Sequence, residues 1–311
     1  MKITIAGGAG AMGSIFGGRL SQKGHDVLLY DVAEKTVQKI NREGLRILDK
    51  NQHTDTIRVK SSSDPSDAKE SDVVIVFTKC FHTEDAIKSL LPFLSGNTRI
   101  LSLQNGWGNA QTISKITGRE RLLIGVNYVS GTVLEPGFVK QVGNPLAYIG
   151  RWGLPTDSFT QSFSEVLSET GIQTTASDHV ITEIWKKLAL NVVSLPTAAL
   201  LKFQAHLLIA YQPVVWLMEK LLAETIAVAK AQEINLEYEE RYEAILKVLE
   251  NAVGAKGSML QDAEAMRKTE IDVINGAVIE AGKQWKVPTP FNECMFSLVK
   301  AMEQDYLKKD K

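Results

Sequence analysis

The sequence predicts a doubly wound α/β domain at 1–178, followed by a separate all-helical domain at 179–311. Three observations support this division. The chain opens with a strand, a glycine-rich turn and a helix. Apolar, β-branched runs then alternate with helical segments as far as Ser177 and Asp178, a pair of helix-capping residues. Beyond this pair the apolar residues recur at helical spacing nearly to the end of the chain, so we place the domain boundary there.

The opening segment contains a glycine motif of the form GxGxxG. Residues 2–6 carry β-branched side chains and predict a buried parallel strand. Gly8, Gly10 and Gly13 follow, and they permit a tight turn, close approach to a pyrophosphate and packing of the next helix on the strand. Strand, turn and helix together predict a Rossmann-type dinucleotide site at the helix N-terminus. Its loop comprises Gly8, Ala9, Gly10, Ala11, Met12 and Gly13.

A second predicted strand, at 26–30, completes a βαβ unit and ends at Asp31. An acidic side chain at this place accepts hydrogen bonds from both ribose hydroxyls of NAD and repels the 2′-phosphate of NADP. We therefore expect NAD(H) as the preferred cofactor. In the alternative, Asp31 only caps the following turn, and Lys35 or Lys23 neutralises the phosphate of NADP(H).

Further strands of the first domain follow in order. The segments 45–48 and 56–59 predict a small hairpin. The segments 122–128, 132–142 and 146–150, which glycine and proline signals separate, predict antiparallel strands. A helix at 156–171 and a last strand at 172–175 follow. The strand at 72–77 leads to Lys79, and the strand at 99–103 leads to Asn105. Ligands of open α/β sheets lie beyond the carboxyl ends of the strands, so both residues are candidates for cofactor contact. The alternatives are a solvated lysine and a turn asparagine.

Composition excludes several classes of protein. The 311 residues are 44% hydrophobic with a formal charge of -1, so no basic excess attracts nucleic acid or an anionic membrane. No uninterrupted apolar stretch reaches the length of about 18 residues that a membrane span needs. Cys80 and Cys294 cannot form a disulfide framework, and we expect buried, reduced thiols and a cytoplasmic location. The histidines lack ligand spacing, so we expect no metal site.

The helical domain is expected to contain a helix from residue 181 and others at 214–232, 238–253, 259–284 and 292–306. In the first of these, Lys187, Asn191 and Ser194 form a polar stripe beside the apolar face. Lys186 instead lies in line with apolar residues. The stripe therefore selects Lys187 as the functional lysine, against the alternative of a solvated helix edge.

The expected helix at 259–284 places Glu270 in the centre of an apolar face. Because burial of an unpaired charge is costly, Glu270 must be paired, protonated or solvated by a functional cleft. Asp262 and Asp272 lie off this face and are expected to be surface acids. Ser258, just before the helix, is either a cap or a donor to a substrate carboxylate.

These motifs together resemble the ketopantoate reductase family, also called 2-dehydropantoate 2-reductase. The resemblance rests on the glycine motif, Lys79, the sequence QNG at 104–106, the sequence WKKLALN at 185–191 and the long run from Ser258 to Pro290. It implies reduction of the C2 ketone of 2-dehydropantoate to (R)-pantoate with hydride from a nicotinamide, a step toward pantothenate and coenzyme A. A homodimer is compatible with it.

The resemblance also implies roles for individual residues. Lys187 would be the general acid and Glu270 its catalytic partner, while Lys79 would lie beside the cofactor. Asn105, Asn191 and Ser258 would contact the substrate or the nicotinamide.

The chain departs from the family pattern at two positions. Leu195 stands where an asparagine often contacts the substrate, and Asp31 stands where a basic residue is usual. The first departure leaves open a related reductase of another branched 2-oxo acid. A protein that binds NAD(H) without chemistry is a further alternative, against which Lys187 and Glu270 argue, since binding alone requires neither.

Overall fold

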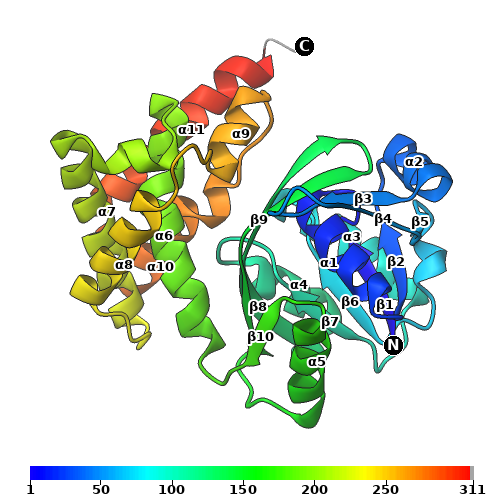
Figure 1. The fold of residues 1–311 in the computed structure, drawn as a ribbon. Helices are drawn as coiled ribbons and strands as arrows, with labels where there is room; N and C mark the ends of the chain where they lie inside the picture. Colours follow the sequence, from blue (N-terminus) through cyan, green and yellow to red (C-terminus); the bar gives the residue numbers. More distant parts are fainter. Residues whose placement is uncertain (309–311) are drawn as a thin grey trace. The chain divides into compact units, whose positions relative to one another are not determined.

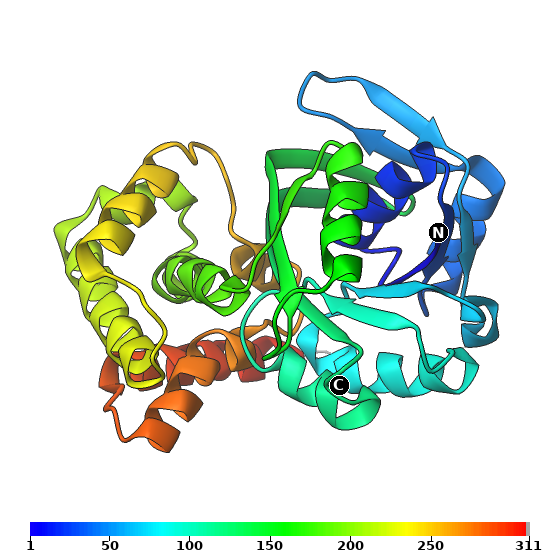
Figure 2. The same cartoon turned by 90° about the horizontal axis from the view of Figure 1, so that it is seen from below.

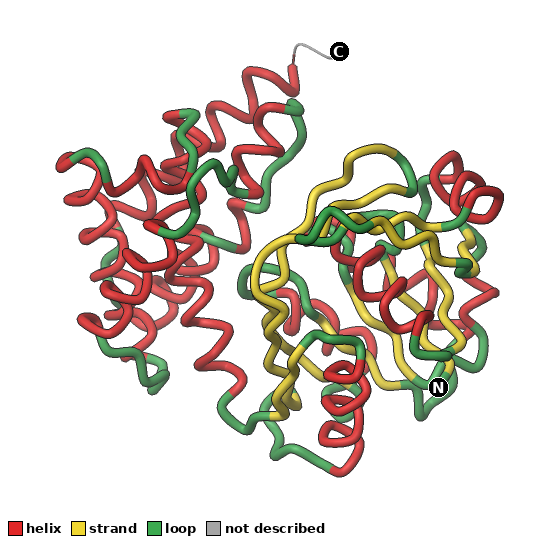
Figure 3. The backbone as a smooth tube through the Cα atoms, in the orientation of Figure 1, coloured by secondary structure: helices red, strands yellow, loops and turns green. Residues whose placement is uncertain are grey.

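The computed structural model describes residues 1–308 and divides into two compact units. The first unit comprises residues 1–104 and 109–180, and the second comprises residues 105–108 and the described chain from residue 181 onward. The division after Val180 lies close to the predicted boundary. Strands occur in the first unit, and the described part of the second is helical (Figure 3).

The first unit alternates strands with helices along the chain (Figure 1). Its strands are β1 (Lys2–Ala6), β2 (Asp26–Tyr30), β3 (Leu45–Leu48), β4 (Thr54–Ile57), β5 (Lys60–Ser62), β6 (Val73–Val76), β7 (Arg99–Ser102), β8 (Leu122–Glu135), β9 (Phe138–Arg151) and β10 (Gln173–Ala176). Its helices are α1 (Ala11–Gln22), α2 (Glu34–Glu43), η1 (Pro65–Ala68), η2 (Cys80–His82), α3 (Thr83–Leu90), η3 (Leu91–Phe93), α4 (Asn109–Thr117) and α5 (Ser158–Glu169). The α/β class and the first two strands are as predicted.

The sheet runs in the order β4-β3-β9-β8-β7-β6-β1-β2-β5, with β10 paired to β9. In the part of the sheet from β8 to β5, each strand is parallel to its neighbours. Strands β1 and β6 are adjacent, but the strand that follows each in sequence lies on opposite sides of this pair: β2 beside β1, and β7 beside β6. Right-handed crossovers therefore put α1 on one face and α3 and α4 on the other, as Figure 2 shows. The pair β1 and β6 is the switch point, where ligands of such sheets bind.

One prediction in the sheet was wrong. The three strands expected at 122–128, 132–142 and 146–150 are the two long antiparallel strands β8 and β9, joined by a turn at Pro136 and Gly137. Gly131 does not end a strand, because it lies inside β8, where a Cβ atom would meet the Ile15 side chain at 2.5 Å. Gly143, with φ of +81°, lies beside a register shift between β8 and β9.

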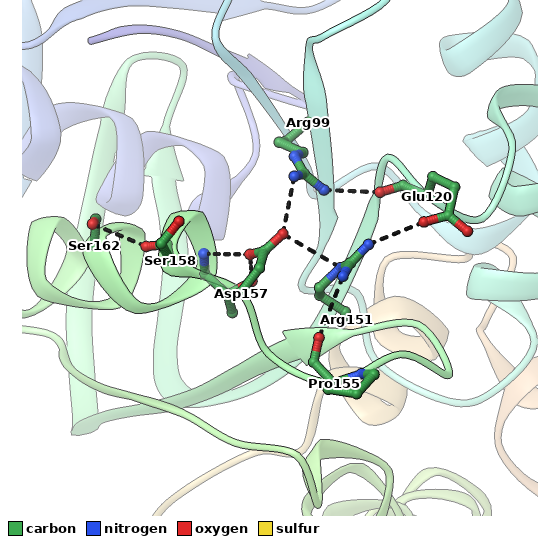
Figure 4. A network of polar contacts seen from close by, with 8 residues as sticks. Arg99, Glu120, Arg151, Pro155, Asp157, Ser158 and Ser162 are labelled. Atoms are coloured by element: carbon green, nitrogen blue, oxygen red, sulfur yellow. Dashed lines mark hydrogen bonds and ion pairs between the residues drawn. The ribbon is translucent and has the colours of Figure 1, made fainter.

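An ion-pair network at the amino end of β7 joins this strand to β9 and α5 (Figure 4). Asp157 caps α5 by accepting a hydrogen bond from the Thr160 amide at 2.9 Å, and its other oxygen pairs with Arg99 at 3.0 Å and Arg151 at 3.5 Å. Burial acts to raise the pKa of Asp157, but the hydrogen bonds from Thr160 and the two guanidinium charges outweigh burial and lower it. The network thus joins β7, β9 and α5 at the end of the sheet opposite to the strand ends that carry the glycine loop.

The second unit is a bundle of helices. They are α6 (Val180–Leu201), η4 (Ala205–Ile209), α7 (Gln212–Ala231), α8 (Tyr238–Glu250), α9 (Ser258–Glu264), η5 (Ile271–Val273), α10 (Asn275–Trp285) and α11 (Pro290–Lys308). The core is formed around α6, whose Trp185, Leu188 and Val192 are at most 1% exposed. Pro196 lies inside α6 and cannot donate to the Val192 carbonyl, which instead accepts from the Asn275 side chain at 3.4 Å.

The structure shows the environment of the longest apolar helix and of the two cysteines. Helix α6 is long and apolar enough to cross a membrane by length and composition, but 67% of its apolar window is buried in the protein, as in a core helix. Neither Cys80 nor Cys294 forms a disulfide, but the expected burial was wrong, because Cys80 is only partly buried and Cys294 is exposed. Cys294 lies on the outer side of α11, so its apolar sequence neighbours did not indicate burial.

Candidate active site

The glycine loop connects β1 to α1 and is held against β2. The Gly7 and Gly8 amides both donate to the Tyr30 carbonyl at 3.0 Å. A Cβ atom at Gly8 would lie 2.7 Å from the Leu29 Cα, and one at Gly13 would lie 2.2 Å from the Gly7 carbonyl oxygen. A side chain at either position would clash with the protein itself, so Gly8 is required for the tight turn and Gly13 for the close packing of the helix.

Gly10 differs from the other two glycines of the motif. A Cβ atom there would meet only the Gly7 carbonyl oxygen, at 3.4 Å, and the residue is exposed. It is the N-cap residue of α1, and no side chain caps this helix start. The open face of Gly10 and the amides of the first helical turn therefore fit the phosphates of a dinucleotide, with Ala9, Ala11 and Met12 completing the loop.

Asp31 follows β2 and lies beside this loop. Its carboxylate accepts one hydrogen bond from the Ala9 amide and one from the Ala33 amide, each at 3.0 Å. The second bond is the turn cap that the sequence left as an alternative. The first brings the charge of Asp31 to the loop that fits the pyrophosphate.

Lys79 lies at the carboxyl end of β6, next to β1 in the sheet. Gly7 packs closely on this end of β6, since a Cβ atom at Gly7 would lie 2.8 Å from the Thr78 amide nitrogen. The side chain of Gln104 donates to the Thr78 carbonyl at 2.8 Å and to the Thr83 hydroxyl at 2.7 Å, which fixes the segment. Lys79 is partly buried beside the glycine loop.

In the second unit, the polar stripe of α6 faces inward. Asn191 and Ser194 are each 7% exposed and Lys187 is partly buried, so the stripe is not a solvated helix edge. Burial lowers the pKa of Lys187 to about 8, although the charge of Glu270 acts to raise it. Lys186 forms a side-chain ion pair with Glu183 at 2.8 Å instead. The two adjacent lysines therefore have different environments, and the choice of Lys187 as the functional lysine stays a prediction.

Glu270 is buried, at 7% exposure, and lies near enough to Lys187 to affect its pKa. The single helix expected at 259–284 was wrong, because Glu270 lies in a break between α9 and α10. The chain leaves α9 through Met266, whose φ is +52°, and the Arg267 amide donates to the Asp262 carbonyl at 2.8 Å. This is a Schellman ending with methionine in place of the usual glycine, so no glycine marked the end of the helix.

Asp262 and Asp272 have different environments. Asp262 was expected at the surface but is 3% exposed and pairs with Arg267 at 3.0 Å, because the early end of α9 folds Arg267 back over it. Asp272 is exposed, as predicted, and pairs with Lys300 at 3.3 Å.

Residues 105–108 belong to the helical unit, although the sequence assigned them to the α/β domain. The Trp107 amide donates to the Val273 carbonyl at 2.8 Å, and the Trp107 ring packs on Trp185 with centroids 5.8 Å apart. Gly106 has φ of +83°, and a Cβ atom there would meet the Val273 oxygen at 2.3 Å. Asn105 is therefore tethered to the segment directly after Glu270.

Ser258 is the first residue of α9, and Gly257 occupies the N-cap position. The capping alternative for Ser258 was therefore wrong, and its hydroxyl remains a candidate donor. Leu195 is 8% exposed, and a Cβ atom at Gly257 would lie 2.8 Å from its Cδ2. Along α6, Leu195 continues the line of Lys187 and Asn191 with an apolar side chain.

Comparison with known proteins gives two family models that together match most of the chain. One, described as ketopantoate reductase PanE/ApbA, matches residues 3–153, and the other, ketopantoate reductase PanE/ApbA C terminal, matches residues 179–303. A 2-dehydropantoate 2-reductase of Pyrococcus abyssi is 31% identical over 97% of this chain and 98% of its own length. The chain belongs to the ketopantoate reductase family.

Members and neighbours of this family have been solved. A PanE/ApbA family ketopantoate reductase from Ralstonia eutropha superposes with a TM-score of 0.91 at 29% identity, covering 99% of this chain and 100% of that one. A D-mandelate dehydrogenase with NADH and anilino(oxo)acetate superposes with a TM-score of 0.93, also at 29% identity, covering 98% and 99%. The Rossmann-type domain and the helical domain are therefore those of the family.

Proposed function

We propose that this protein reduces the C2 ketone of 2-dehydropantoate to (R)-pantoate with hydride from a nicotinamide cofactor. The observation that carries the proposal is Lys187, a partly buried lysine with a pKa lowered to about 8, beside the buried carboxylate of Glu270. A titratable group whose pKa is shifted by burial, beside a charged partner, is typical of catalytic acids and bases. The 2-dehydropantoate 2-reductases among the relatives support the same substrate.

In the proposed reaction, the glycine loop, Asp31 and Lys79 would hold the cofactor, which when bound would supply hydride for reduction at C2. The Lys187 ammonium donates a proton to the ketone oxygen, which becomes the hydroxyl, and the lysine is left neutral. Glu270 keeps Lys187 protonated by its charge and accepts from the new hydroxyl. Asn105, Asn191 and Ser258 donate to the substrate carboxylate or hold the nicotinamide.

The proposal is tested with a panel of 2-oxo acids, followed by loss of the nicotinamide absorbance. We expect 2-dehydropantoate to give the highest kcat/KM. A second candidate, reduction of another branched or aromatic 2-oxo acid, is favoured by Leu195 and by the D-mandelate dehydrogenase among the structural neighbours. A higher kcat/KM for such an acid would establish the second candidate. Cofactor binding without turnover of any acid would identify a sensor instead.

The cofactor preference is expected to be for NADH over NADPH. The charge of Asp31 lies beside the loop proposed for the pyrophosphate, and a 2′-phosphate brought near it is opposed by about 4 kcal/mol for each charge pair at about 4 Å before screening. If about 1.4 kcal/mol survives screening, kcat/KM favours NADH about tenfold. The measurement is kcat/KM with each cofactor for the wild type and for Asp31→Arg, in which the preference should reverse.

A control separates charge from loop structure, since Asp31 also accepts from Ala9 and Ala33. Asp31→Asn keeps an acceptor and removes the charge, so it should lose the preference while NADH turnover is retained. A wild-type enzyme that favours NADPH would contradict the assignment. An unchanged preference in Asp31→Arg would show that another residue discriminates between the cofactors.

The pH dependence should report Lys187. A general acid must be protonated, so kcat/KM is expected to be constant below pH about 8 and to fall tenfold per unit above it. Lys187→Arg stays protonated throughout, so its residual activity should lack this alkaline fall. A wild-type pH profile of kcat/KM that stays flat to about pH 10 would exclude a lysine of lowered pKa as the general acid.

We also propose a cytoplasmic location and a homodimer. The reduced state of Cys80 and Cys294, neither of which forms a disulfide, supports the reducing compartment. Within residues 1–308, no group of His, Cys, Asp and Glu side chains has the arrangement of a metal site. Sedimentation equilibrium of the purified protein measures the assembly state directly.

A further inference from the structure

Glu270 lies in the connection of residues 265–274 between α9 and α10, which is irregular except for the short helix η5 that follows Glu270. The connection is buried around Glu270: Thr269 and Ile271, on either side of it, are 0% exposed, and Glu270 itself is 7% exposed. Its backbone dihedrals are those of neither helix nor strand at Glu270, with φ of -98° and ψ of 27°. Repetitive secondary structure therefore does not set the direction of the Glu270 side chain.

One face of α11 holds this connection at three successive points. Lys300, Glu303 and Tyr306 are spaced by three residues and share that face. The Tyr306 hydroxyl donates to the Arg267 carbonyl at 2.8 Å. The Lys300 ammonium contacts the Asp272 carboxylate at 3.3 Å. Glu303 lies between them and binds Thr269.

Glu303 makes the strongest of these contacts. Its Oε1 accepts hydrogen bonds from both the amide and the hydroxyl of Thr269 at 2.6 Å, and its Oε2 pairs with Lys300 at 3.2 Å. The residue is 3% exposed, so these bonds are shielded from water. Hydrogen bonds to an ionised acceptor are about twice as strong as neutral ones, and their loss leaves a buried amide without a partner. Glu303 thus fixes the backbone one residue before Glu270.

We propose that Glu303 is a positioning residue for catalysis, which holds Glu270 toward Lys187 by fixing Thr269. This inference rests on the proposed function for the role of Glu270. Glu303 does not act on Lys187 directly: burial and the charge of Glu270 account for the pKa of the lysine. Among the described residues, the titratable groups that interact with Glu303 are Lys300 and Tyr306, both on its own helix, and Asp272 in the connection shares Lys300 with it.

The test compares Glu303→Ala and Glu303→Gln with Glu224→Ala. Glu224 is a matched control, because it accepts from the Phe291 and Asn292 amides at 2.8 and 3.0 Å and so fixes the other end of α11. Glu303→Ala should lower kcat by about tenfold to a hundredfold, as a small misplacement of a catalytic group does, with KM for the cofactor unchanged. Glu303→Gln keeps an oxygen that can accept both Thr269 bonds, so it should restore most of the activity. Glu224→Ala should retain kcat at temperatures where it is folded.

A second readout needs no turnover and so remains decisive if the proposed reaction fails. Lysine side-chain NMR gives the pKa of Lys187, which the charge of Glu270 raises. Glu303→Ala should lower this pKa as Glu270→Gln does, the double variant should lower it no further, and Glu303→Gln should leave it near the wild-type value. If Glu303→Ala does not fold, Thr269→Val should shift the same pKa by a smaller amount. An unchanged Lys187 pKa in the folded variants, or an equal fall in Glu224→Ala, would overturn the proposal.

Discussion

Replacement of Lys187 by alanine should lower kcat by about 10²- to 10⁴-fold, the range typical of a lost general acid. Lys187 is the lysine of α6 whose pKa is lowered by burial, to about 8, and it is the one affected by Glu270. A methyl group cannot deliver the proton that the ketone oxygen gains, so the fall should be in kcat more than in cofactor KM. Steady-state kinetics at about pH 7 measure both kcat and the KM for the cofactor.

The adjacent lysine provides the matched control. Lys186→Ala removes an ion pair with Glu183 on the same helix and should retain turnover within about threefold, since partly exposed pairs contribute little. If Lys186→Ala lost activity while Lys187→Ala kept more than about a tenth of it, the assignment of the proton donor would be wrong. Circular dichroism of both variants shows whether the fold is retained.

Glu270→Gln should lower kcat by about 10²-fold, because the amide keeps the shape of the side chain but loses its charge. Without that charge the pKa of Lys187 falls below its value of about 8, so less of the lysine is protonated at neutral pH. The alkaline fall of the pH profile should therefore move to lower pH, and acidic conditions should restore part of the activity. The full pH profile of kcat/KM measures this shift.

Thermal unfolding of the same variant gives an independent outcome. A buried carboxylate that only tolerates its position costs stability, and its neutral isostere would then be more stable. Normal activity combined with a raised Tm in Glu270→Gln would therefore identify Glu270 as a tolerated buried acid. The functional assignment requires reduced activity in a folded protein.

The sequence predicted the first unit well where local signals agree. Strands β1 and β2 begin and end as expected, because apolar β-branched runs there are bounded by glycine and by Asp31. Gly131 misled the prediction of β8, since its role is contact with α1 from a distant part of the sequence. Such tertiary reasons for a glycine leave no local pattern.

The environment of a candidate residue could be predicted where one regular helix carries it, but not where the chain is irregular. Helical phase was enough to predict different environments for Lys187 and Lys186 within α6. Periodicity placed Glu270 in the middle of a helix, because the apolar residues on both sides of the break happen to continue one pattern. No sequence signal indicated Glu303, since its hydrogen bonds to Thr269 span 34 positions of the chain.

The helical unit is discontinuous in sequence, and this limits how the protein can be divided into fragments. A helical fragment that starts at Ile181 would lack residues 105–108. Trp185 would lose the aromatic ring packed on it, and the Val273 carbonyl would lose its amide donor, three residues from Glu270. Insertion or exchange of the helical domain as a cassette would therefore have to carry the short peptide around Trp107 with it.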